Sequence, residues 1–156
     1  NGESWRESNV YDAGTDAVVC QTPLASFGLT VCYDLRFPHL YRALARAGAD
    51  VLCVPAAFTR QTGEAHWSAL LRARAIENGA FVIAAAQGGD HEDGRATYGH
   101  SLIISPWGEI IAEAAGADPG VILGEIDPHK AAESRARIPN LGLENAISVR
   151  VFPAAH

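Results

Sequence analysis

Two short, almost wholly apolar runs flank one helical segment, and this arrangement constrains the fold more than any other feature. The runs are DVLCVPAAF, residues 50–58, and AFVIAAAQ, residues 80–87. A short run without polar alternation is typical of a strand buried on both faces, as in a parallel sheet covered by helices. The sequence therefore predicts neighbouring parallel strands joined by a helix.

Three helices are expected, over residues 37–48, 62–79 and 127–138. Pro38 and Pro128 suit the first turn of a helix, where the missing N–H costs nothing, and Asp127 has the side chain of an N-cap. Gly48 and Gly79 are in positions that end the first and second helices. The second helix is expected to bury a stripe formed by Trp67, Leu70, Leu71, Ala73 and Ile76, and to leave Arg72 and Glu77 in solvent.

The remaining segments indicate antiparallel pairs. Residues 17–34 predict two strands joined by a tight turn around Ala25 and Ser26, and residues 100–114 predict a hairpin that turns at residues 106–108. Residues 88–98 are expected to form a polar, glycine-rich loop and residues 120–127 a further strand. The order predicts a single α/β layered domain over residues 1–156, parallel in the middle and antiparallel later.

Charge and composition narrow the class of partner. The net charge is −6 with both signs interspersed, which argues against a nucleic-acid footprint or a membrane-surface helix. No apolar run approaches the roughly 18 residues of a membrane span. Three cysteines, an odd number, favour a reducing cytoplasm over a disulfide framework. A small molecule or another protein is the expected partner.

Cys32 follows a predicted strand at the edge where ligands bind in parallel sheets. The ends of the other two strands, residues 56–59 and 87–89, are expected to converge with it. Backbone N–H groups at a helix start, together with Arg36, suit a nucleophilic sulfur. A lone cysteine in an apolar strand is nevertheless usually a packing residue, so spacing alone favours a core role. Cys20 and Cys53 are expected in the core.

Several blocks, in order, resemble the nitrilase superfamily of carbon-nitrogen hydrolases. The blocks are CYDLRFP, VPAAFT, TGEAHWSALLRARAIENGAFVIAAAQ, YGHSLIISPWGE and GVILGEID. Together they are far more specific than one cysteine, and they are most similar to the branch of deaminated-glutathione amidases and omega-amidases. The resemblance implies part of a four-layer α-β-β-α sandwich with two facing sheets, incomplete at its N-terminal side.

The resemblance also implies roles for individual residues. Cys32 corresponds to the nucleophile that forms a thioester acyl-enzyme from an amide, and the backbone N–H of Tyr33 corresponds to an oxyanion donor. Glu7 corresponds to the family's second glutamate, which orients the other groups. The base glutamate and the lysine of the family have no counterpart, because the only lysine is Lys130, expected as a solvated residue of the third helix. The chain alone is therefore expected to be inactive.

For four side chains expected near Cys32, substrate contact and a structural role are both possible. Phe58 and Thr59 are candidates for substrate contact, with ordinary loop packing an equal alternative. Asp34 and Arg36 are expected to form a local ion pair rather than to contact substrate.

Two functions remain open. The first is a thiol amidohydrolase acting on a short linear amide, without cofactor or metal, as a cytoplasmic homodimer or larger homo-oligomer. The second is a non-catalytic binding or oligomerisation module.

Overall fold

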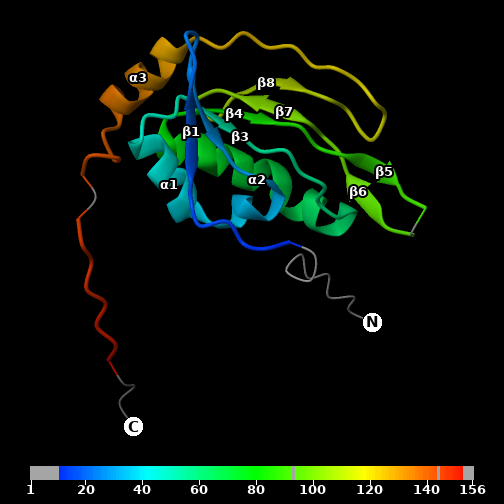
Figure 1. Cartoon of the computed structure of the whole chain (residues 1–156), viewed down its shortest axis with the longest axis horizontal. Helices are drawn as coiled ribbons and strands as arrows, with labels where there is room; N and C mark the ends of the chain where they lie inside the picture. The colour runs from blue at the N-terminus through cyan, green and yellow to red at the C-terminus, as the bar shows by residue number, and fades with distance from the viewer. Residues whose placement is uncertain (1–10, 93, 144, 153–156) are drawn as a thin grey trace.

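The central sheet has six strands in the order β1-β2-β3-β4-β7-β8. A computed structural model describes residues 11–92, 94–143 and 145–152 of the chain (Figure 1). β2, β3 and β4 are parallel, whereas β1, β7 and β8 join antiparallel, so the predicted parallel centre and later hairpin are confirmed. The sheet strands are β1 Val18–Gln21, β2 Ser26–Leu29, β3 Val51–Cys53, β4 Phe81–Ala84, β7 Leu102–Ile104 and β8 Ile110–Glu113.

Helices α1 and α2 lie together on one side of this sheet (Figure 1). The helices are α1 Pro38–Arg46, α2 Arg60–Asn78 and α3 Pro128–Arg137, and a 3-10 helix, η2, covers Cys32–Arg36. Gly79 ends α2 in the left-handed conformation, and Asp127 caps α3 by accepting from the backbone N–H of His129, as predicted. Within the described residues, no helix has the length and apolarity needed to cross a membrane.

The two faces of the sheet differ in how they are covered. Leu52, Val82 and Ile104 belong to the buried core cluster, which also contains α1 and α2 side chains such as Tyr41 and Trp67. On the opposite face, Leu29 pairs with Cys53 and Cys53 with Ile83 in the strand register. Leu29 is 47% exposed, and Cys53 and Ile83 are half-buried. An apolar sheet face of this kind is typical of a surface that packs on a further layer.

Three segments differ from the sequence-based expectation. Residues 88–98 form a hairpin, β5 Gly88–Asp90 with β6 Ala96–Tyr98, in place of a loop. Residues 120–127 do not form a strand, since they join no hydrogen-bonded ladder in the described part of the chain, and Val121 and Leu123 are exposed. The first turn is formed by Thr22 and Ala25, so Ser26 already belongs to β2.

The predicted core was wrong at two positions. Ile76 is 50% exposed beside Gly108, and the α2 stripe is instead completed by Arg74, Ala75 and Asn78. Arg74 is buried because its guanidinium finds hydrogen-bond acceptors inside the protein, which a periodicity of apolar residues cannot indicate. Cys20 is exposed, since it lies on the edge strand β1.

Gly63 lies within α2, where helix propensity alone favours alanine over glycine. Alanine normally stabilises a helix interior by about 1 kcal/mol relative to glycine. A Cβ at Gly63 would lie 2.2 Å from the Cβ of Tyr98 on β6. We therefore expect Gly63→Ala to lower the free energy of unfolding by about 2 kcal/mol, measured by urea denaturation, because the hairpin must move away from α2.

The exposed Ala65, two residues later, provides the reference for helix propensity. Ala65→Gly should destabilise by about 1 kcal/mol through propensity alone. Stabilisation by Gly63→Ala would show that the contact with Tyr98 does not constrain the helix.

Candidate active site

Cys32 opens a strained turn immediately beyond β2. Its backbone φ is +46°, in the left-handed region that residues other than glycine adopt infrequently and that recurs at active sites. The N–H of Cys32 donates to the carbonyl of Pro55 at 2.8 Å, and the N–H of Val31 donates to the Asp34 carboxylate at 2.9 Å. These bonds hold the turn, so the cysteine lies just beyond the strand rather than at its last residue as predicted.

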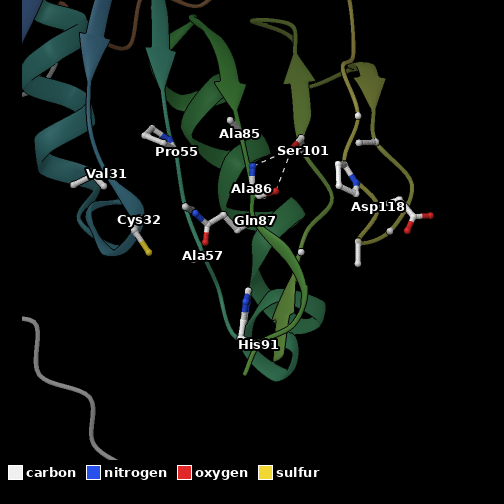
Figure 2. A pocket seen from close by; sticks show the side chains of 17 residues that line it. Val31, Cys32, Pro55, Ala57, Ala85, Ala86, Gln87, His91, Ser101 and Asp118 are labelled. Atoms are coloured by element: carbon white, nitrogen blue, oxygen red, sulfur yellow. Dashed lines mark hydrogen bonds between the residues drawn. The ribbon is translucent and has the colours of Figure 1, made fainter. Parts of the chain in front are cut away.

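A cavity of about 840 Å³ lies at this end of the sheet. Figure 2 shows the sulfur of Cys32 pointing away from its ribbon, toward the neighbouring strand end at Ala57. The predicted convergence of three strand ends is confirmed. The lining residues are Val31, Cys32, Pro55, Ala56, Ala57, Ala85, Ala86, Gln87, Gly88, His91, Ser101, Ala114, Gly116, Ala117, Asp118, Pro119 and Gly120.

Three polar side chains of the cavity wall were not predicted, those of Ser101, His91 and Asp118. The Ser101 hydroxyl accepts from the backbone N–H of Ala86 at 2.9 Å and lies 3.4 Å from its carbonyl oxygen, which ties β7 to the end of β4 (Figure 2). His91, on the β5–β6 connection, lies 2.8 Å from the Thr97 hydroxyl through its Nε2. His91 lies in the segment 88–98, expected to be a polar, glycine-rich loop, and Ser101 lies in the expected hairpin of residues 100–114.

Tyr33 follows the nucleophile candidate directly. Among the described residues, no carbonyl or side chain accepts a hydrogen bond from its backbone N–H. A free N–H beside a cysteine is the kind of donor that can stabilise an oxyanion. The side chain of Tyr33 is exposed, and its ring contacts Phe37 with a centroid separation of 5.7 Å.

Phe58 and Thr59 do not line the cavity in the described part of the chain. Phe58 is buried against Trp67, with ring centroids 4.9 Å apart, and Thr59 caps α2 by accepting from the N–H of Thr62. Their contact with substrate stays a prediction. Glu7 lies outside the described residues.

Arg36 does not pair with Asp34 as expected, because no ion pair among the described residues joins them. The Asp34 carboxylate accepts from Val31 instead. The Arg36 guanidinium lies over two rings, 5.5 Å from the centre of Tyr33 and 5.1 Å from that of Phe58. The Asp34 carboxylate therefore accepts a backbone N–H at the start of the 3-10 helix, where N–H groups lack a partner within the helix. Pairing of opposite charges along the sequence does not predict this contact.

The three cysteines have different surroundings. All are free thiols, and among the described residues only Cys32 lines the cavity. Burial raises the pKa of Cys53, so this thiol stays neutral at physiological pH. Cys20 lies exposed on β1, away from the strand ends that form the cavity. Chemistry at a cysteine in this chain is therefore expected at Cys32.

Comparison with known proteins places the chain. The model of the carbon-nitrogen hydrolase family matches residues 1–136. The chain belongs to the carbon-nitrogen hydrolase family. This membership, and the nitrilase-like fold, agree with the resemblance drawn from the sequence blocks.

Relatives within the family are similar to this chain over most of its length. The deaminated glutathione amidase of Dictyostelium discoideum is 49% identical over 138 residues, which cover 88% of this chain and 47% of that protein. The chain spans about half the length of the curated relatives it matches.

Solved structures of other proteins superpose on this chain. The NitFhit protein of C. elegans superposes with a TM-score of 0.80 at 39% identity, over 90% of this chain and 34% of that one. A mutant of the amidase from Nesterenkonia sp. AN1, with acrylamide added at its active-site cysteine, superposes with a TM-score of 0.66 at 30% identity, over 85% of this chain and 51% of that one.

Proposed function

We propose that the chain carries the nucleophile of a thiol amidohydrolase, with Cys32 as that nucleophile. The observation that carries the proposal is the left-handed turn at Cys32, which opens into the cavity between the strand ends. Family membership and the cysteine adduct of the Nesterenkonia amidase support it. Strain of about 1–3 kcal/mol is typically retained where it serves a site.

The reaction has two halves. The sulfur of Cys32 attacks the amide carbon, and the carbonyl oxygen takes negative charge that the N–H of Tyr33 can stabilise. The C–N bond then breaks, and the nitrogen takes the proton that the Cys32 thiol gave up. Ammonia departs, and the acyl group remains on Cys32 as a thioester. Water attacks the thioester carbon, the C–S bond breaks, and the carboxylic acid departs as the thiol regains its proton. Glu7 is proposed to orient this site.

Among the described residues that line the cavity with Cys32, none is a glutamate or a lysine that could serve as the base or the lysine of the family. Lys130, the only lysine of the sequence, is exposed on α3 and lines a separate cavity of about 230 Å³. We therefore propose that these 156 residues alone do not hydrolyse amides. Ammonia release by the purified chain that disappears in Cys32→Ala would contradict this.

The proposed substrate is a short linear amide that bears a carboxylate. The relatives named deaminated glutathione amidases support this class. The test is ammonia release by the protein expressed from its complete gene, with deaminated glutathione, an α-keto ω-amide and a nitrile as substrates. Among the three substrates, we expect the fastest turnover with deaminated glutathione. Turnover of the nitrile alone would overturn the amidase assignment, and no turnover of any would favour the non-catalytic module.

A further inference from the structure

A buried arginine lies directly behind the turn that carries Cys32. Arg74, on α2, is only 5% exposed. Its Nε and Nη2 atoms both donate to the carbonyl of Leu35, at 3.1 and 2.8 Å. Leu35 belongs to η2, three residues after Cys32, and is fully buried. Two donors of one planar guanidinium therefore hold a single carbonyl of η2, the turn that begins at Cys32 and is called the nucleophile turn below.

The carbonyl of Leu35 needs such a partner because of the residue that follows the turn. In a 3-10 helix this carbonyl would accept from the N–H three residues later, which is position 38. Pro38 begins α1 there and has no N–H to donate. A buried carbonyl without a partner is costly, so the arginine compensates for the proline that starts the next helix.

The arginine is itself held in place by two contacts. Its Nη1 donates to the Glu77 carboxylate at 2.9 Å, and its guanidinium lies 5.4 Å from the ring centre of Tyr41. The Tyr41 hydroxyl is 2.7 Å from that of Thr30, which donates to the carbonyl of Cys53. Burial raises the pKa of Tyr41 well above its usual range, so this hydroxyl stays protonated. The network links α2, α1 and the end of β3.

We infer that Arg74 is a positioning residue for Cys32. The turn is fixed at its start by the bond from Cys32 to Pro55 and at its end by the bonds from Arg74 to Leu35. With both ends held, the left-handed backbone at Cys32 has no freedom to relax. Without the arginine, the turn relaxes, and the side chain of Cys32 loses its fixed place in the cavity wall. This inference rests on the proposed role of Cys32.

The test compares Arg74→Gln with Arg74→Lys in the protein expressed from its complete gene. For Arg74→Gln we expect kcat to fall on the order of 10- to 100-fold with KM nearly unchanged, because a misplaced nucleophile affects the chemical step. Alkylation of Cys32 by iodoacetamide, followed by peptide mass spectrometry, should slow about tenfold relative to Cys20 in the same molecule. Arg74→Lys keeps the charge and one donor, so it should recover part of both rates.

Arg135→Gln is the matched control. Arg135 is also a partly buried arginine, and it donates to the carbonyls of Asn78 at 3.1 Å and Ala49 at 2.6 Å, away from the nucleophile turn. Arg135→Gln should lower the midpoint temperature of thermal unfolding, yet leave kcat and the Cys32 alkylation rate within about twofold of the wild-type values. Equal effects of Arg74→Gln and Arg135→Gln on both rates, or no recovery in Arg74→Lys, would overturn the inference.

Two further measurements separate the possible failures. If Arg74→Gln does not fold, Glu77→Ala removes the carboxylate that accepts from Nη1 of Arg74. This variant should still lower kcat and Cys32 alkylation, by a smaller factor than the arginine change, and unchanged rates in it would also overturn the inference. If the wild-type protein hydrolyses no amide, the proposed function fails. The ratio of Cys32 to Cys20 alkylation still decides the role of Arg74 in that case.

Discussion

Replacing Cys32 with alanine is expected to lower amide hydrolysis by at least about 10⁴-fold, because removal of a nucleophile leaves only binding and oxyanion stabilisation. The measurement is kcat/KM for deaminated glutathione in the protein expressed from its complete gene. The fold should survive, since Cys32 is only half-buried and alanine retains its Cβ. Thermal unfolding within a few degrees of wild type would confirm that the loss is chemical.

The other two cysteines provide matched controls for this change. Cys20→Ala and Cys53→Ala remove thiols that do not line the cavity. Both should keep kcat/KM within about threefold, although Cys53→Ala will cost some stability because the side chain is half-buried. Retained turnover in Cys32→Ala, or its loss in Cys20→Ala, would require a different nucleophile.

Replacing Trp67 with alanine is expected to have the largest effect on stability. The side chain is 1% exposed, its ring contacts Phe58, and its Nε1 donates to the carbonyl of His100 at 2.7 Å. Large aromatic-to-alanine changes in a core typically cost about 3–5 kcal/mol. The carbonyl of His100 would also lose its partner, next to Ser101 in the cavity wall. We expect a loss of about 4 kcal/mol in the free energy of unfolding, measured by urea denaturation.

Trp67→Phe separates the two contributions. It keeps most of the buried apolar surface and removes the N–H donor, so it should cost about 1–2 kcal/mol. If both variants cost the same, packing of the indole would contribute little, and the bond to His100 would explain the whole effect.

The sheet and its helices could be predicted from the sequence because their signals are local. The apolar runs at residues 50–58 and 80–87 indicate buried strands, and the capping residues Asp127 and Gly79 mark helix ends. The β5–β6 hairpin was missed because its glycines suggest a loop, while its pairing depends on contacts with α2 and with the strand end at Phe58.

The site was only partly predictable for a similar reason. Its position beyond a predicted strand made Cys32 a candidate nucleophile, although spacing alone favoured a core role. The sequence blocks then favoured the nucleophile over the core residue. Arg74 is buried because it donates to the carbonyl of Leu35, which lies 39 residues away in the chain. The spacing of apolar residues along a helix does not indicate such a contact. The exposure of Cys20 and Ile76 likewise depends on which strand lies at the sheet edge and on what covers each face.

The central claim is that Cys32 forms a thioester with the acyl part of an amide. The most direct measurement is to mix the protein expressed from its complete gene with deaminated glutathione, quench in acid within one turnover, and map the modified peptide by mass spectrometry. The account predicts an acyl group on the peptide that contains Cys32, removed by hydroxylamine and absent in Cys32→Ala. Substrate turnover with no acyl group on Cys32, or with the group on another residue, would contradict it.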